Sequence, residues 1–84
     1  MNDVYKLFDI IGENLKRIRK EKIGLSQEKL AESIEMSRSF LSQIESPNVD
    51  IGVSIDTLFI ISQTHNIDIR EFFKGYERLM KNNK

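Results

Sequence analysis

The sequence of 84 residues has no cysteine and only one histidine. The lack of cysteine excludes a disulfide framework and a thiolate metal site, and one histidine is too few for the usual histidine-based zinc site. We therefore expect neither a metal nor any other cofactor. A chain without cysteine suits a reducing compartment, and we expect the protein to be cytoplasmic.

The sequence also lacks a long hydrophobic run. No apolar stretch approaches the roughly 20 residues that a membrane-spanning helix needs, and Met1-Asn2-Asp3 does not have the basic-then-apolar order of a secretion signal. We expect no membrane partner. The length fits one domain spanning residues 1–84, which leaves no residues for a sensory domain, so no small-molecule ligand is expected.

An excess of charge of one sign is missing as well, because 13 Lys and Arg balance 13 Asp and Glu. The net charge therefore gives no overall attraction to nucleic acid. The basic residues are nevertheless concentrated in one place, since five of the seven residues from 16 to 22 are Lys or Arg. This cluster is either the solvated side of a helix or a surface that faces an anion.

Residues 25–45 carry the strongest pattern in the chain and predict two short helices joined by a turn. Ser26 can cap a helix that begins at Gln27, and Ser37 can cap one that begins at Arg38. Each helix has apolar residues at helical spacing, and these must pack together: Leu30, Ala31 and Ile34 in the first, Leu41 and Ile44 in the second. The small side chain of Ala31 lets the two helices approach closely.

Packing Leu41 and Ile44 inward leaves a polar outer face on the second helix, at Arg38, Ser39, Ser42 and Gln43. In the DNA major groove, Arg can donate two hydrogen bonds to guanine, and Gln can pair with adenine. We therefore predict that these four residues contact bases. The alternative is an ordinary solvated helix face. Phe40 either packs in the core or touches a thymine methyl group.

Residues 10–73 resemble the helix-turn-helix domain of the phage-repressor and Cro family, the Xre-like regulators. The matching segments are Ile11-Gly12-Glu13-Asn14-Leu15-Lys16-Arg17-Ile18-Arg19, Leu25-Ser26-Gln27-Glu28-Lys29-Leu30-Ala31, Ser42-Gln43-Ile44-Glu45, Ser54-Ile55-Asp56-Thr57-Leu58 and Phe72-Phe73. The resemblance implies an all-α, five-helix lambda-repressor-like domain with the helix-turn-helix formed by its second and third helices. It also implies an ion pair between Arg19 and Glu45. Phosphate contacts are expected from Gln27, with Ser26, Ser37 and Asn48 as further candidates.

The chain departs from the family pattern at two places. Glu35 stands where the family usually has Gly in the turn between the two helices, so we expect a non-glycine residue with positive φ there. Ser46-Pro47 follows Glu45 where the family usually has Gly, so the recognition helix should end differently.

The remaining helices follow from periodicity and from end signals. Apolar spacing indicates a first helix from near Asp3 to about Lys22, which is secure from Ile11 and ends at Ile23-Gly24. Gly12 interrupts the apolar stripe, so the alternative is a separate turn or short helix over the first ten residues, with 1–9 as an N-terminal extension. A loop is predicted over 46–53. Ser54 should cap a fourth helix that Asn66 closes, with Ile55, Leu58, Phe59 and Ser62 on one side of it, and Asp68 with Glu71 should form the capping box of a fifth.

The fifth helix carries more apolar side chains than docking it onto one domain requires. Phe72 and at least one of Ile69 and Phe73 should serve the core, which ends near residue 73. Residues 74–84 should form the end of the helix and a tail, and Tyr76, Leu79 and Met80 should face a second copy of the chain.

Nothing in the sequence indicates an enzyme, since no arrangement around the serines and the single His65 resembles a catalytic triad. We predict a homodimeric, sequence-specific transcriptional regulator that binds double-stranded DNA at a palindromic operator, with recognition helix 38–45 in the major groove. Phage repressors, restriction-modification controller proteins and antitoxin-type regulators all fit, and the controller type is preferred. The alternative is an antitoxin-like protein-interaction module with the same fold and little affinity for DNA.

Overall fold

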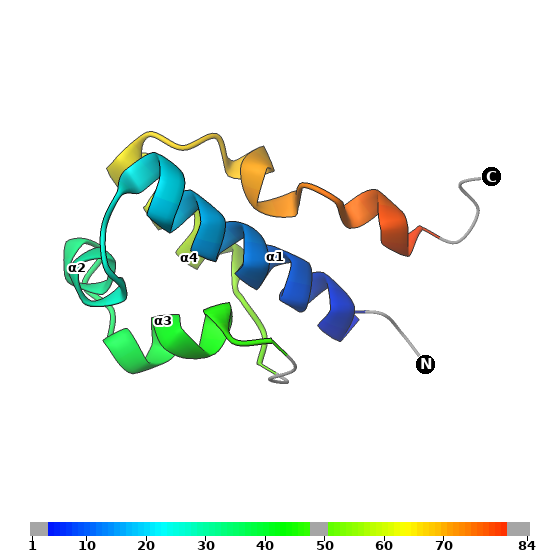
Figure 1. Cartoon of the computed structure of the whole chain (residues 1–84), viewed down its shortest axis with the longest axis horizontal. Helices are drawn as coiled ribbons and strands as arrows, with labels where there is room; N and C mark the ends of the chain where they lie inside the picture. Colours follow the sequence, from blue (N-terminus) through cyan, green and yellow to red (C-terminus); the bar gives the residue numbers. More distant parts are fainter. Residues whose placement is uncertain (1–3, 48–50, 81–84) are drawn as a thin grey trace.

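The computed structural model of the chain describes residues 4–47 and 51–80, and these are all-helical, which confirms the predicted fold class (Figure 1). The α-helices are α1 (Val4–Ile18), α2 (Gln27–Ser33), α3 (Arg38–Glu45) and α4 (Ile55–His65). A π-helical turn, η1 (Arg19–Ile23), extends α1. Two short 3-10 helices, η2 (Ile69–Phe73) and η3 (Tyr76–Leu79), follow α4. In the part of the chain that the structure describes, no helix is long and apolar enough to cross a membrane.

Serine caps start both helices of the helix-turn-helix, as predicted. The Ser26 hydroxyl accepts a hydrogen bond from the Lys29 amide at 3.1 Å, and the Ser37 hydroxyl accepts one from the Phe40 amide at 3.0 Å. Between the helices, Glu35 has a φ of 58°, which confirms that a non-glycine residue holds the left-handed turn. These local interactions fix where α2 ends and where α3 begins.

The continuous first helix is confirmed and the alternative of a separate N-terminal turn is wrong, because α1 runs without a break through Gly12 from Val4 to Ile18. Gly12 has a packing role instead. A Cβ atom built on it would lie 2.1 Å from the carbonyl oxygen of Ile44, near the end of α3. Only a residue without a side chain allows the backbones of α1 and α3 to come this close.

The end of the first helix is a wider turn than an α-helix makes. The amide of Gly24 donates to the carbonyl of Arg19 at 2.7 Å, an i to i+5 hydrogen bond that closes η1. Gly24 has a φ of 78°, so it takes the predicted left-handed conformation. The chain then turns toward α2.

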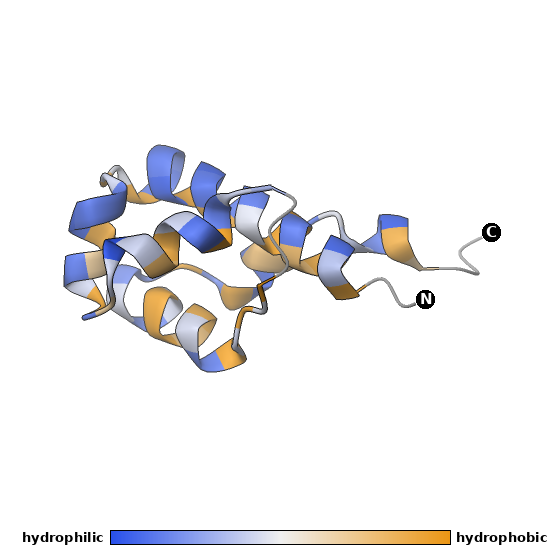
Figure 2. Ribbon diagram, turned by 90° about the horizontal axis from the view of Figure 1, so that it is seen from below, coloured by the Kyte–Doolittle hydropathy of each residue, from blue (hydrophilic) through white to orange (hydrophobic). Residues whose placement is uncertain are grey.

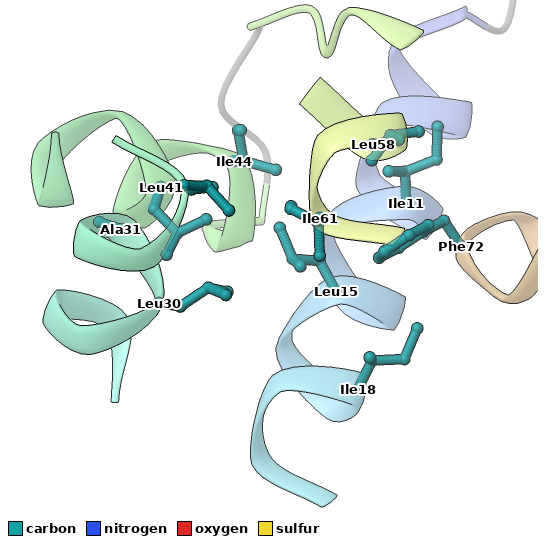
Figure 3. Close-up of a cluster of buried hydrophobic side chains, with 11 residues drawn as sticks. Ile11, Leu15, Ile18, Leu30, Ala31, Leu41, Ile44, Leu58, Ile61 and Phe72 are labelled. Atoms are coloured by element: carbon teal, nitrogen blue, oxygen red, sulfur yellow. The ribbon is translucent and has the colours of Figure 1, made fainter. Parts of the chain in front are cut away.

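The core lies between α1, the helix-turn-helix, α4 and η2 (Figure 3). In Figure 2 the outer sides of the upper helices are hydrophilic and their hydrophobic parts face the interior. Ala31 is 2% exposed, and its small side chain lies where α2 packs on α3. The buried apolar residues are Ile11, Leu15, Ile18, Leu30, Ala31, Ile34, Leu41, Ile44, Leu58, Ile61 and Phe72.

The predicted inward face of α4 is partly wrong. Leu58 and Ile61 are buried, whereas Ile55 and Phe59 are 61% and 52% exposed. Apolar residues occur on several sides of this helix, so their spacing did not select one face. Asn66 closes the helix with a φ of 57°, as predicted.

Ser54 stands at the start of α4, but its hydroxyl does not cap the backbone. It donates instead to the carboxylate of Asp56 and lies 3.0 Å from the Thr57 hydroxyl. The hydrogen bond from Ser54 lowers the pKa of Asp56.

The fifth helix is not continuous, because η2 and η3 are separated at Lys74 and Gly75. The buried Asn14 side chain donates to the carbonyls of Phe72 at 2.8 Å and Lys74 at 3.0 Å. In a continuous α-helix those carbonyls would accept from amides four residues later. Gly75, with a φ of 93°, redirects the chain.

The predicted capping box at the start of η2 also differs. The Asp68 carboxylate accepts from the amide of Arg70 at 2.9 Å, while Glu71 pairs with Lys22. Arg70 also binds the Asp68 carboxylate through its side chain, and this hydrogen bond lowers the pKa of Asp68 to about 2.

Replacing Gly12 with Ala tests the close contact of α1 with α3. Alanine favours a helix by roughly 1 kcal/mol over glycine, but the overlap of its Cβ with the Ile44 carbonyl should outweigh this gain. We expect a net loss of about 1–3 kcal/mol in the free energy of unfolding, measured by urea titration with circular dichroism.

The matched control is Gly52→Ala, where the nearest atom to an added Cβ is Phe8 Cζ at 3.5 Å. That distance is an ordinary contact, so the control should change stability little. Equal effects of the two substitutions would contradict the close approach at Gly12.

Candidate nucleic-acid interface

The outward face of α3 brings together the four residues predicted to contact bases. Arg38, Ser39, Ser42 and Gln43 line one shallow hollow on the surface. On the opposite side of the same helix, Leu41 and Ile44 are buried in the core. Within the described residues, no intramolecular hydrogen bond holds the side chain of Arg38 or Gln43. These two long side chains therefore have donors and acceptors available for a ligand.

The other predicted contact residues of the helix-turn-helix differ in exposure. Ser26 and Ser37 are exposed, and each hydroxyl oxygen accepts a backbone hydrogen bond while its hydrogen stays available to donate. Phe40 is half-buried and packs against the core. Asn48 lies outside the described residues. Ser46 ends α3 in an extended conformation, with its hydroxyl donating to the Ser42 carbonyl at 2.8 Å.

A buried ion pair joins α3 to the end of α1. Arg19 Nε donates to Glu45 Oε2 at 2.7 Å and Arg19 Nη2 donates to Glu45 Oε1 at 3.0 Å, with both side chains almost completely buried. Arg19 Nη1 donates to the carbonyl of Leu25 at 2.9 Å. One guanidinium therefore holds both the turn before α2 and the last residue of α3.

Gln27 belongs to the same network. Its Nε2 atom donates to Glu45 Oε1 at 2.9 Å, and the side chain is half-buried. Sequence reasoning placed Gln27 at a phosphate but missed this bond, because the two residues are 18 positions apart and no local pattern links them. Only the folded chain shows that the Glu45 carboxylate lies within hydrogen-bond distance of the Gln27 side chain.

The basic cluster of residues 16–22 does not form one continuous surface. Arg19 is buried in its pair with Glu45. Arg17 donates to the Asn14 side chain at 3.3 Å, and Lys22 forms an ion pair with Glu71 at 3.3 Å. The other two members, Lys16 and Lys20, are exposed and have no hydrogen-bond or ion-pair partner among the residues that the structure describes. Two members of the cluster, Arg19 and Lys22, therefore connect η1 with α3 and η2.

A second surface lies where η3 runs beside the first turns of α1, at the same end of the molecule in both views (Figures 1 and 2). Tyr76 and Met80 are 45% and 54% exposed, and Leu79 is half-buried. Together with Val4 and Leu7 they line an apolar groove.

The sequence comparisons agree with this architecture. A helix-turn-helix family model matches residues 15–72, and the chain belongs to this family, the Xre-like regulators. Members of the family bind double-stranded DNA, and the chain is a DNA-binding regulator of transcription.

The chain is similar to Control protein C.MunI from a Mycoplasma species, with 40% identity over 78 residues, which cover 93% of this chain and 99% of that protein. No solved structure matches significantly.

Replacing Arg19 with Met tests the buried ion pair. The substitution leaves the Glu45 carboxylate buried without its cation, which should lower the free energy of unfolding by about 3–5 kcal/mol. Adding Glu45→Met should recover much of that loss, because two apolar side chains can fill the site without a buried charge. Urea titrations measure the loss in Arg19→Met and the recovery in the double variant. An Arg19→Met variant as stable as the wild type would contradict the stabilising role of the ion pair.

Proposed function

We propose that this protein is a homodimeric transcriptional regulator that reads the DNA major groove with α3 at a two-fold symmetric operator. The observation that carries the proposal is the gathering of Arg38, Ser39, Ser42 and Gln43 on the outward face of α3. An α-helix fits the major groove, and these side-chain types match the hydrogen-bonding edges of guanine and adenine there.

The roles within the interface follow from chemistry and position. Arg38 and Gln43 act as base readers, and the short Ser39 and Ser42 allow close approach to the bases. Gln27, Ser26 and Ser37, at the starts of α2 and α3, contact phosphates and so set the register without reading sequence. Asn48 is a further phosphate candidate in the segment after α3.

The neutral net charge is compatible with this role. Phosphate contacts by neutral donors need no cation, and the exposed charge that the interface requires is supplied locally by Arg38. The electrostatic share of binding should therefore be small, and affinity should depend less steeply on salt than for a strongly basic protein.

The dimer is proposed to form through the apolar groove of Val4, Leu7, Tyr76, Leu79 and Met80. Exposed aromatic and aliphatic side chains gather there from both ends of the described chain, and a second copy can bury them in a symmetric contact. Two copies would present two α3 helices to half-sites roughly 34 Å apart, one turn of DNA. A single helix covers too few base pairs to select one site.

The regulated genes are proposed to be those of a restriction-modification system. This part of the proposal rests on the likeness to Control protein C.MunI along almost the whole of both chains. The operator is then expected near the promoter of the protein's own gene.

Arg38→Ala tests the assignment of α3 as the recognition helix. Losing a two-bond contact to guanine should cost roughly 1–3 kcal/mol per half-site and relax the preference at one base pair. Mobility-shift titrations at one stated salt concentration, on DNA upstream of the gene and on a shuffled sequence, measure the ratio of the two affinities.

The control for Arg38 is Lys20→Ala, which removes one exposed positive charge outside the helix-turn-helix. It should leave the ratio unchanged. An unchanged ratio for Arg38→Ala would show that Arg38 does not read a base, and a wild type that binds neither DNA would favour the interaction-module alternative.

Met80→Asp tests the dimer surface. Sedimentation equilibrium of the wild type should give a mass near twice 9.8 kDa, and a charge in the apolar groove should shift it toward one chain without loss of helical content. Phe59→Asp is the matched control, because Phe59 is as exposed as Met80 but lies on α4 outside that groove. Dissociation by Phe59→Asp alone would place the interface on α4 instead.

A further inference from the structure

We propose that Glu45 is a positioning residue for DNA binding, which acts by orienting the side-chain amide of Gln27 toward a phosphate. The inference rests on the proposed function and deepens it, because it assigns a second role to a buried residue that does not itself reach the DNA. The observation behind it is the bond of 2.9 Å from Gln27 Nε2 to Glu45 Oε1.

The acceptor chemistry of Glu45 fixes which way the Gln27 amide points. Glu45 is paired with Arg19 and 2% of its side chain is exposed, so its carboxylate offers only acceptors. Gln27 must therefore turn its NH2 group, and not its carbonyl oxygen, toward Glu45. The alternative orientation would place two acceptor oxygens against each other.

An NH2 group that donates one hydrogen to Glu45 has its second hydrogen fixed in the same plane. Gln27 is the first residue of α2, and its side-chain amide is bonded to Glu45, the last residue of the proposed recognition helix. Among the described residues the second hydrogen has no acceptor, so it can donate to a phosphate without further ordering of the side chain. Such preorganisation lowers the entropic cost of binding.

Glu45 holds its own position through three donors. Arg19 supplies two of them at 2.7 and 3.0 Å, and Gln27 supplies the third. Because Arg19 is anchored in turn to the Leu25 carbonyl, the carboxylate is fixed relative to the turn before α2. The Gln27 amide is then tied through Glu45 and Arg19 to the end of the first helical segment and to the end of α3 together.

The first test is an NMR spectrum of the wild-type protein labelled with nitrogen-15, without DNA. The two hydrogens of a glutamine side-chain amide give separate signals in any case, because rotation about the C–N bond is slow. The Gln27 hydrogen that faces Glu45 should therefore be recognised by slower exchange with solvent than the side-chain hydrogens of the exposed Gln43, as expected for a hydrogen bonded to a carboxylate. Adding DNA should then move mainly the signal of the other Gln27 hydrogen. Exchange of both Gln27 hydrogens as fast as those of Gln43 in the free protein would overturn the inference.

The second test is a double-mutant cycle in DNA affinity with Gln27→Ala and Glu45→Gln. Gln27→Ala should weaken binding to operator and shuffled DNA alike by about tenfold, the loss of one hydrogen bond to a charged group. If Glu45 acts through Gln27, adding Glu45→Gln to the Gln27→Ala variant should lower its DNA affinity by less than about twofold. If the affinity loss of the double variant equals the product of the losses of the two single variants, the bond from Gln27 to Glu45 only stabilises the fold.

Stability measurements on the same four proteins make the cycle interpretable. Urea titration identifies conditions in which each variant is folded, and binding is compared only there. Should Glu45→Gln fail to fold, the NMR test of the wild type still decides the inference. Wild-type protein that binds no DNA would overturn the proposed function and this inference with it, whereas DNA binding with multiplying losses would overturn the inference alone.

Discussion

The buried ion pair of Arg19 with Glu45 is the interaction on which the arrangement of the helix-turn-helix depends. Two charged side chains in the core are costly unless every donor and acceptor is satisfied, and here the carboxylate accepts three hydrogen bonds. The same guanidinium also binds the Leu25 carbonyl. The end of α1, the entry to α2 and the end of α3 are therefore fixed by one polar network.

Close backbone packing gives the second constraint. Gly12 lets the middle of α1 reach the carbonyl of Ile44, one residue before Glu45. The ion pair and this contact therefore both hold the same end of α3 against the first helical segment of the chain. Between them they determine which face of α3 is turned outward, and so which side chains are available to DNA. Packing in the core and the proposed reading of bases are connected through this one helix end.

Features governed by neighbouring residues could be predicted from the sequence. The serine caps at Ser26 and Ser37, the left-handed Gly24 and the positive φ of Glu35 each depend on a few adjacent residues. The four residues on the outer face of α3 follow from helical periodicity, and the structure gathers them in one hollow. Contact of these residues with DNA bases stays a prediction.

Features set by distant residues could not be predicted in the same way. The break between η2 and η3 depends on Asn14, about 60 residues earlier, because its side chain donates hydrogen bonds to the carbonyls of Phe72 and Lys74. The continuity of α1 at Gly12 depends on α3, and the bond from Gln27 depends on Glu45. On α4, apolar residues occur on several sides, so the sequence alone did not show that Ile55 and Phe59 face outward; the packing of the neighbouring elements decides this.

Methylation interference tests most directly whether α3 binds in the major groove. Dimethyl sulfate methylates guanine N7 in the major groove and adenine N3 in the minor groove, and DNA that still binds can be separated from DNA that does not. If α3 reads guanine through Arg38, N7-methylated guanines should be missing from the bound fraction at two clusters about 10 base pairs apart. Interference only at adenine N3, or methylated guanines spread equally between bound and free DNA, would contradict major-groove recognition by α3.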